Sequence, residues 1–386
     1  MKSDARPPAK VLFPYVGVAA GGSHVSSLGL IQKLDRARYE PVLALQHMDG
    51  AVHDAMKEAD APLLQAPASP EMKAGGGVSG SDYFRILAAT PRLARFVREG
   101  RYAIVHGNDG LSTATWALAA KLAGAKLVWH NRGNPRAAGL RFVAPLLADR
   151  VVSVSAFASP RPGLVSAAGK NAVVHSPFDV DVDADRVAAR DALATELRAD
   201  PRTLFVGFFG NLIARKRPLL FVDAVVALRE RLGGRPVKGL LFGAADDGVD
   251  DEVRARAAAA GAADDIHLMG FRKPGATWIA ACDILLVPAV EEPFGRTLIE
   301  AMLVRTPIVA TDSGGNPEAI RHEETGLIAP PEDAAALADA MARLAATPDL
   351  AARLAEAARA DALQRFGEDR HAEAIMAIYK AALAGR

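Results

Sequence analysis

Short apolar runs rich in β-branched residues alternate with longer stretches rich in Ala and Leu along the first half of the chain. The apolar runs predict strands, and the longer stretches with helical spacing predict the helices between them. The predicted strands are residues 11–13, 41–46, 103–106, 126–130 and 151–155. The predicted helices are residues 26–34, 51–59 and 112–122. Such alternation favours a parallel sheet with helices on both faces.

The same pattern restarts with the continuous apolar run 203–209, which is typical of a strand covered on both faces. Further strands are predicted at 237–242, 266–268, 284–287 and 307–310, and helices at 218–232 and 250–260. Residues 334–384 are helical in pattern, with breaks near Thr347-Pro348 and Phe366-Gly367. The polar, Asp-rich stretch 178–185 marks the junction. Two doubly wound parallel sheets in tandem are the simplest account, with one domain over residues 1–178 and the other over residues 179–366.

Composition narrows the classes of function. The chain has 386 residues and a formal net charge of +1, so no global field favours nucleic acid as a partner. Its one cysteine, Cys282, excludes an intramolecular disulfide and a cysteine-based metal site. Residues 1–10 lack the apolar centre of a signal peptide, and no uncharged apolar run reaches about 18 residues. We therefore expect a cytoplasmic enzyme.

The most distinctive segment is the turn and helix start at residues 292–302, shortly after the predicted strand 284–287. Its two carboxylates, Glu292 and Glu300, lie at most about 12 Å apart along a helix axis, which is the span of a sugar nucleotide. Carboxylates accept hydrogen bonds from sugar hydroxyls. The backbone N–H groups from Gly295 to Leu298 stand at the helix start, where they can meet a diphosphate. The competing interpretation is a salt bridge from Glu300 to Arg296 or Arg305.

This segment resembles the Glu-x7-Glu signature of the retaining glycosyltransferases of family 4. The resemblance implies that Glu300 holds the ribose of a nucleoside diphosphate sugar and that Glu292 contacts the donor sugar. It also implies donor contacts along the turn, from Phe294, Gly295, Arg296, Thr297 and Leu298. For the whole chain it implies a GT-B fold, in which two Rossmann-like, doubly wound domains face each other across a cleft. The last segment, residues 367–386, is then expected to cross back to the first domain.

Glycine turns follow predicted strands in both halves. Gly314 and Gly315 allow close backbone approach, and they are similar to the family's glycine pair beside the diphosphate, although such a pair is usually only a turn. Gly21 and Gly22 look like the family's N-terminal glycine loop, which faces the donor phosphate and the acceptor. Because Gly17 is followed by glycine only at Gly21, the chain lacks Gly-x-Gly-x-x-Gly, which argues against a nicotinamide oxidoreductase.

The turn after strand 203–209 carries a cluster of cations. Lys216 matches a lysine of the family, and a cation in a turn before a helix suits a diphosphate leaving group. Asn211 occupies the position at which the family usually has an arginine. The two-cation clamp of the family therefore depends here on Arg215 or Arg217. The competing interpretation of the cluster is a solvated basic turn.

Polar side chains also end two predicted strands of the first half, at His106 and His130. Ligands meet the carboxyl ends of strands in open α/β sheets, which places both histidines at the edge of the cleft. A buried structural histidine is the competing interpretation for each. The family often has His or Asn at the position of Asn108 and His near that of His130. The resemblance therefore implies catalytic roles for Asn108 and His130, with His106 behind them.

A stripe of arginines could form a basic helix face, and its members are Arg85, Arg92, Arg95, Arg98 and Arg101. Basic amphipathic helices can rest on anionic membranes, and some members of the family glycosylate lipid-linked acceptors. Pro91 interrupts the stripe, so a solvated face is the favoured interpretation. Peripheral contact with the inner membrane face is the less favoured hypothesis.

The resemblance implies a hexosyltransferase that moves a sugar from a nucleoside diphosphate donor to a hydroxyl acceptor, with Glu292 and Lys216 at the reacting centre. The acceptor class stays open among glycans, lipid-linked molecules and small molecules. No Asp-x-Asp stands at a predicted strand end in the cleft, so we expect neither a metal nor another cofactor. Two alternatives stay open. One is another GT-B enzyme, such as a sugar-nucleotide epimerase or an inverting transferase. The other is a non-catalytic binding protein, to which Asn211 points.

Overall fold

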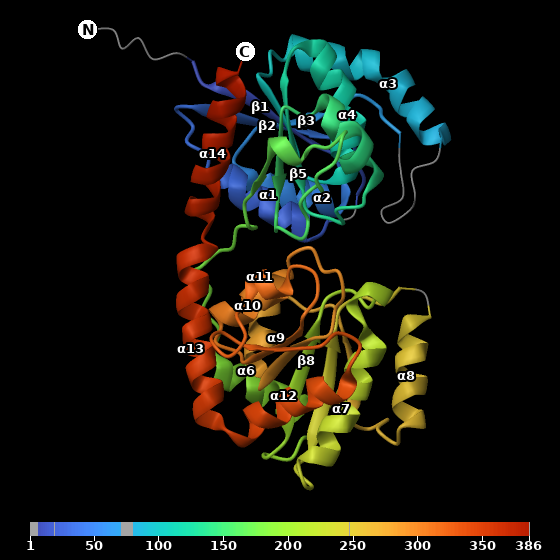
Figure 1. The fold of residues 1–386 in the computed structure, drawn as a ribbon, viewed down its shortest axis with the longest axis vertical. Helices are drawn as coiled ribbons and strands as arrows, with labels where there is room; N and C mark the ends of the chain where they lie inside the picture. Colours follow the sequence, from blue (N-terminus) through green and yellow to red (C-terminus); the bar gives the residue numbers. More distant parts are fainter. Residues whose placement is uncertain (1–6, 19, 71–79, 247, 386) are drawn as a thin grey trace, which may run out of the picture. The chain divides into compact units, whose positions relative to one another are not determined.

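The computed structural model describes residues 7–18, 20–70, 80–246 and 248–385, and the chain divides into two compact units (Figure 1). The first unit contains Met1–Phe178 together with Glu368–Arg386, and the second contains Asp179–Gly367. The chain thus leaves the first unit where the Asp-rich stretch begins. Its last helix, α14 (Glu368–Ala384), belongs to the first unit, where it packs against α1 (Gly22–Gln32).

The first unit is built on a seven-stranded sheet of order β3-β2-β1-β4-β5-β6-β7, and all its neighbouring strands are parallel. The strands are β1 (Ala9–Tyr15), β2 (Tyr39–Leu45), β3 (Leu63–Gln65), β4 (Ile104–Gly107), β5 (Lys126–Asn131), β6 (Arg150–Ser153) and β7 (Asn171–Val173). The other helices are α2 (Gly50–Met56), α3 (Gly80–Glu99), α4 (Gly110–Ala123) and α5 (Ala144–Leu147). Short helical turns occur at η1 (Lys57–Ala59), η2 (Gly139–Val143) and η3 (Ala168–Lys170).

Two apolar cores cover the two faces of this sheet. Successive strand residues point to opposite faces, so Leu12 and Val105 pack with Trp116 of α4, whereas Phe13 and Ile104 pack with Tyr379 of α14. Because both faces are covered, β1 and β4 read as continuous apolar runs rather than as alternating ones. Burial on both faces therefore explains why the sequence predicts the central strands.

The second unit repeats the plan with a six-stranded parallel sheet of order β10-β9-β8-β11-β12-β13. Its strands are β8 (Leu204–Phe209), β9 (Val237–Phe242), β10 (Ile266–Gly270), β11 (Ile284–Val287), β12 (Ile308–Thr311) and β13 (Leu327–Ala329). Its helices are α6 (Arg186–Glu196), α7 (Pro218–Arg231), α8 (Val249–Ala259), α9 (Gly275–Ala281), α10 (Arg296–Leu303), α11 (Asn316–Ala319), α12 (Ala334–Ala346) and α13 (Pro348–Arg365), and η4 (Ala214–Lys216) precedes α7.

In each sheet the strand order reverses at one point, between β1 and β4 in the first unit and between β8 and β11 in the second. Loops after two such strands diverge to opposite faces, which leaves a crevice at their carboxyl ends where doubly wound folds bind ligands. The predicted candidates fall into these loops: Gly21 follows β1 and Asn108 follows β4, while Lys216 follows β8 and Glu292 follows β11.

The structure departs from the sequence prediction at the sheet edges and at some helix ends. Strands β3, β7 and β13 were not predicted, because three residues are too few to show a period. Helices α6 and α9 were also missed. Helix α1 begins at Gly22, four residues before the predicted start, and the predicted helix 51–59 is divided into α2 and η1.

Candidate functional site

The switch point of the second unit brings together the turns that follow β8 and β11. The amide of Val290, after β11, donates to the carbonyl of Arg215 at a distance of 2.9 Å. This bond fixes η4 beside the start of the 291–295 turn. As a result Lys216 and Glu292, which are far apart in sequence, become neighbours.

Glu292 is 8% exposed and lies between two cations. Its Oε2 is 3.1 Å from the Nζ of Lys216 and also accepts from the Nη1 of Arg215. Burial by itself raises the pKa of Glu292, but Lys216 and Arg215 outweigh that effect, so its pKa lies below the ordinary value. The side chain is therefore an ionised hydrogen-bond acceptor rather than a proton donor, and the three-residue cluster keeps one net positive charge.

The cations of this turn do not all point to the same place. Lys216 lies across Gly210, since a Cβ on that glycine would be 3.2 Å from the Lys216 Nζ. Arg217 turns away and pairs with Glu332 at a distance of 2.6 Å. Asn211 is exposed at the end of β8. Of the two arginines offered by the sequence as substitutes for the clamp, Arg215 is thus the one that joins Lys216.

The glycine pair after β12 has a packing role. The amide of Gly315 donates to the carbonyl of Glu292 at 2.7 Å, and the amide of Glu291 donates to the hydroxyl of Ser313 at 3.0 Å. A Cβ on Gly314 would come within 3.0 Å of the backbone of Glu292, and Gly314 has φ +63. The close approach that the sequence predicted is therefore an approach to the 291–295 turn, and contact with a diphosphate stays a prediction.

Helix α10 begins after Gly295, whose φ of +69 favours glycine. Arg296 and Thr297 are half-buried at its first turn. The amide of Leu298, however, donates to the carbonyl of Gly295 at 3.0 Å, so the predicted free amide at Leu298 is wrong. Phe294 is buried with its ring against Phe366, at 5.6 Å between centroids, which leaves only its backbone for a ligand.

Glu300 lies one turn further along α10 and keeps 31% of its side chain exposed. The Nε of Arg296 is 3.8 Å from its Oε1, which is a loose pair, while Arg305 pairs instead with Glu356 at 2.6 Å. Burial raises the pKa of Glu300, and Arg296 and Lys216 offset only part of that effect. A carboxylate so weakly compensated suits hydroxyl donors from a ligand.

In the first unit, the structure buries both candidate histidines instead of placing them at an exposed edge. His106 and His130 are 0% exposed, and the Nε2 of His106 lies 3.2 Å from the Nδ1 of His130. The other nitrogen of His106 meets the hydroxyl of Tyr379 at 2.6 Å, and the ring of His130 stacks on His371. Because α14 covers both rings within this unit, the structure favours the competing interpretation of each as a buried structural histidine, and their catalytic roles stay predictions.

The electrostatics of this histidine cluster disfavour charged rings. Burial, and then the positive charge of Arg132, lower the pKa values of His106 and His130 well below the ordinary value. Burial likewise lowers the pKa of His371 to about 3. Sequence reasoning missed His371 and Tyr379 because they lie in the last helix, more than 230 positions from β5.

Asn108 ties the two loops of the first switch point together. Its Nδ2 donates to the carbonyl of Ser23 in α1 at 2.6 Å, and its Oδ1 accepts from the Nε of Arg132 at 3.0 Å. Asn108 is 1% exposed, so it positions its neighbours. Gly21, in contrast, is exposed, and a Cβ there would meet no atom within 4 Å. Neighbouring Gly22, the first residue of α1, is exposed as well.

The described residues contain neither a metal-binding cluster nor a membrane-spanning helix. Across those residues, no group of three or more His, Cys, Asp or Glu side chains is arranged to hold a metal ion. None of the helices in the described part of the chain is long and apolar enough to cross a membrane.

Two known families match the chain. Residues 21–159 match the family described as "Glycosyl transferase 4-like domain", and residues 202–347 match the one described as "Glycosyl transferases group 1". The first match lies in the first unit and the second match lies in the second unit. The second match includes both strands of its switch point, β8 and β11, and the first match begins after β1 and includes β4.

Curated relatives carry glycosyltransferase names. The chain is similar to D-inositol 3-phosphate glycosyltransferase of Streptomyces scabiei, with 31% identity over 313 residues that cover 74% of this chain and 69% of that protein. It is also similar to the lipopolysaccharide core biosynthesis mannosyltransferase LpsB of Rhizobium meliloti, with 37% identity over 206 residues. The second alignment covers 51% of this chain and 56% of LpsB, so it spans about half of either protein.

Solved structures resemble the whole chain. HepE of Anabaena in complex with UDP gives a TM-score of 0.80 at 22% identity, covering 96% of this chain and 100% of HepE. Sucrose-phosphate synthase of Thermosynechococcus elongatus gives a TM-score of 0.77 at 19% identity, covering 98% of this chain and 100% of that protein. At such identities the likeness shows the fold, and it confirms the predicted GT-B fold with two parallel-sheet α/β domains.

Proposed function

Because the chain belongs to glycosyltransferase family 4, we propose that it transfers a hexose from a nucleoside diphosphate sugar to a hydroxyl acceptor with retention of the anomeric configuration. The observation that carries the proposal is the pairing of Lys216 and Arg215 with the ionised Glu292 at a switch point. Positive charge and a carboxylate at this place match the two ends of such a donor, a diphosphate and a polyhydroxyl sugar.

The donor is proposed to be a uridine diphosphate sugar. HepE, which shares the fold, has been solved with UDP, with UDP-glucose, and with UDP and glucose. In this chain Glu300, half-exposed on α10, would accept hydrogen bonds from the ribose hydroxyls. The N-terminus of α10, at Gly295 to Thr297, adds the positive end of a helix dipole beside the diphosphate. By the family resemblance, Gly21 and Gly22, both exposed at the start of α1, would face the donor phosphate and the acceptor.

The proposed step breaks the bond between the anomeric carbon and the diphosphate oxygen and forms a bond from the acceptor oxygen to that carbon. The acceptor hydroxyl attacks the face from which the diphosphate leaves, and its proton passes to a diphosphate oxygen. Lys216 and Arg215 stabilise the negative charge that develops on the leaving group. Glu292, ionised and fixed by both cations, positions the sugar hydroxyls and stabilises positive charge at the anomeric carbon. No resident metal or other cofactor is required by this scheme, since protein cations supply the charge.

The test is a thermal-shift panel of UDP, GDP, ADP and TDP on the wild type, on Glu300→Ala and on the control Glu356→Ala. Glu356 is a matched surface carboxylate with 64% of its side chain exposed. A ligand present at 100 times its dissociation constant adds about 2.7 kcal/mol of stability. We expect UDP to stabilise the wild type and the control, with a much smaller effect on Glu300→Ala.

Two other outcomes would contradict the proposal, and each would favour a different function. If none of the four nucleotides stabilises the wild type, the donor site is wrong and the non-catalytic binding protein to which Asn211 pointed gains support. The second outcome concerns the nucleoside diphosphate sugar itself. If the protein releases free nucleoside diphosphate from it without dependence on an acceptor, a sugar-nucleotide epimerase becomes the better explanation.

A further inference from the structure

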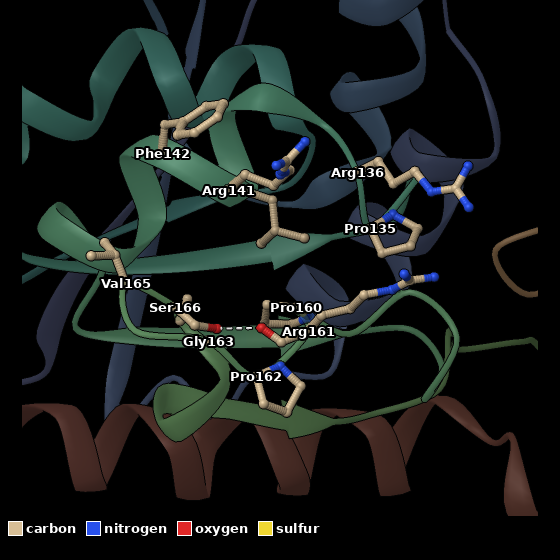
Figure 2. Close-up of a pocket in the computed structure, with 12 residues that line it drawn as sticks. Pro135, Arg136, Arg141, Phe142, Pro160, Arg161, Pro162, Gly163, Val165 and Ser166 are labelled. Carbon is tan, nitrogen blue, oxygen red and sulfur yellow. Dashed lines mark hydrogen bonds between the residues drawn. The ribbon is translucent and has the colours of Figure 1, made fainter.

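A pocket of about 430 Å³ opens in the first unit between η2 and the loop that follows β6 (Figure 2). Its apolar floor is formed by Pro135, Leu140, Pro160 and Ala167, all of which are buried. None of the candidate site residues described above lines it. The pocket therefore requires an explanation of its own.

Arginines line the mouth of this pocket. Arg136, Arg141 and Arg161 are exposed, and Figure 2 shows Arg136 and Arg161 extending in the same direction from two different segments. Between residues 111 and 178 the sequence contains eight Lys and Arg residues, and Asp149 is its single acidic residue. Asp149 is itself within 3.6 Å of Lys121 and 3.5 Å of Lys126. The overall charge of +1 thus conceals a strongly basic region.

Large apolar side chains project beside the arginines. Phe142 is 61% exposed and Leu146 is 69% exposed, on η2 and α5. Leu164 and Val165, on the loop after β6, are 108% and 68% exposed. The Nζ of Lys170 donates to the carbonyls of Pro145 and Ala148 at 2.9 and 2.8 Å, which holds the end of that loop against α5. Phe142 and Val165 both line the pocket, so the two apolar projections lie around one opening.

We name this the η2 surface, made of Arg136, Arg141, Phe142, Leu146, Arg161 and Leu164, and we propose that it docks on a membrane that contains anionic lipids. Cations attract the phosphate headgroups, and apolar side chains enter the boundary between headgroups and acyl chains. A soluble anion would use the pocket alone. Leu146 and Leu164 lie outside its lining, so an anion in the pocket would leave them uncovered, whereas a membrane would cover the apolar side chains gathered around the pocket together with the arginines.

The basic face of α3 provides a contrast within the same unit. Arg85 lies 3.7 Å from Asp82, and Arg92 and Arg98 donate to the carbonyls of Ala68 and Leu122 at 2.5 and 3.0 Å. These arginines are occupied by partners of the protein itself. The α3 face, which the sequence singled out, also exposes Phe84 at 73% and Leu87 at 55%, so it is the competing surface against which the η2 surface is tested.

The experiment is co-sedimentation with vesicles of phosphatidylcholine alone and of phosphatidylcholine with about one third phosphatidylglycerol, at low and high salt. The full chain is tested with three double variants. Arg141→Gln/Arg161→Gln removes charge from the η2 surface, Phe142→Ser/Leu164→Ser removes its apolar side chains, and Arg85→Gln/Arg98→Gln removes charge from α3. Circular dichroism and melting temperature confirm that each variant is folded.

We expect the wild type to bind only the anionic vesicles, and less at high salt. Loss of two arginines from the η2 surface lowers the partition coefficient about 25-fold, since each contributes about fivefold. The Phe142/Leu164 variant binds at least tenfold more weakly, and the α3 variant binds like the wild type. Absence of wild-type binding would refute the proposal, as would loss of binding in the α3 variant alone. Neither result bears on transfer of sugar, since vesicle binding requires no donor.

Discussion

The Nζ of Lys216 lies 3.1 Å from the Oε2 of Glu292, although 75 residues separate the two in the chain. Lys216 and Arg215 keep the pKa of Glu292 below its ordinary value, and the ion pair orients both side chains before any ligand arrives. In a site that binds a diphosphate, this pairing supplies an ammonium group that is already in position and does not have to move when the ligand binds.

Replacing Lys216 by Ala should lower kcat/KM for sugar transfer by about 100-fold or more, because a cation that stabilises the leaving diphosphate is lost. Arg217→Ala is the matched control, because its side chain is in the same turn but pairs with Glu332. It should change kcat/KM by less than about threefold. Steady-state kinetics with the donor found by thermal shift measures both, and equal losses would contradict the assignment of Lys216.

Arg215 should act as the second cation of the clamp. Arg215→Ala is expected to lower kcat/KM by about tenfold to 100-fold, since Glu292 and the diphosphate both lose a charged donor. In that background, Asn211→Arg would place a cation where the family usually has one. We expect this second change to recover at least a part of the lost activity. If Arg215→Ala abolishes activity and the added Asn211→Arg restores none of it, the end of β8 does not reach the donor.

Gly314→Ala should lower the stability of the protein, whereas Gly21→Ala should lower activity and leave stability nearly unchanged. A Cβ on Gly314 would press on the backbone of Glu292 at a positive φ, so we expect a loss of about 3 kcal/mol in the free energy of unfolding. Gly21 has an extended backbone at φ -151 and space around it, so Gly21→Ala should change the free energy of unfolding by less than about 0.5 kcal/mol. Activity of Gly21→Ala should nevertheless fall if the donor phosphate approaches there. Urea unfolding and kinetics separate the two effects.

The buried histidines of the first unit predict sensitivity to acid. Folding lowers the pKa of His371 from an ordinary value near 6.5 to about 3, so the unfolded chain binds a proton that the folded chain does not. Stability is complete above pH about 6.5 and is lost as the pH falls toward 3. At pH 5 this one group costs about 2 kcal/mol.

Urea unfolding of the wild type between pH 5 and pH 8 measures that loss. The control His322→Gln removes a histidine with 53% of its side chain exposed, and its slope of stability against pH is the reference for His371→Gln. His371→Gln should reduce the slope. An unchanged slope in His371→Gln would show that another group dominates the acid response.

Removal of metal ions should not slow the reaction. In the proposed mechanism, Lys216, Arg215 and the start of α10 supply the charge that a divalent cation can provide in metal-ion catalysis. Dialysis against EDTA followed by assay in metal-free buffer should therefore retain activity within about twofold. A loss that Mg²⁺ or Mn²⁺ restores would show that the protein cations are insufficient.

The central strands could be predicted from the sequence because burial on both faces makes them continuous apolar runs. β8 is fully buried, and it was predicted within one residue of its observed bounds. β13 and the other three-residue edge strands could not be predicted, because their extended form is imposed by a neighbouring strand. The local sequence pattern therefore predicts the central strands of each sheet but not its edge strands.

For the candidate site, the sequence by itself determined that Glu292 and Glu300 stand at the two ends of one turn and helix start. It also determined that Lys216 follows another strand of the same sheet. Only the tertiary structure decided that Arg215, and not Arg217, joins Lys216, and that α14 buries His106 beneath Tyr379. The physical reason is that residue type and spacing specify periodicity within one element. Which side chains meet across elements depends on strand order and on the return of the last helix, and neither leaves a local pattern.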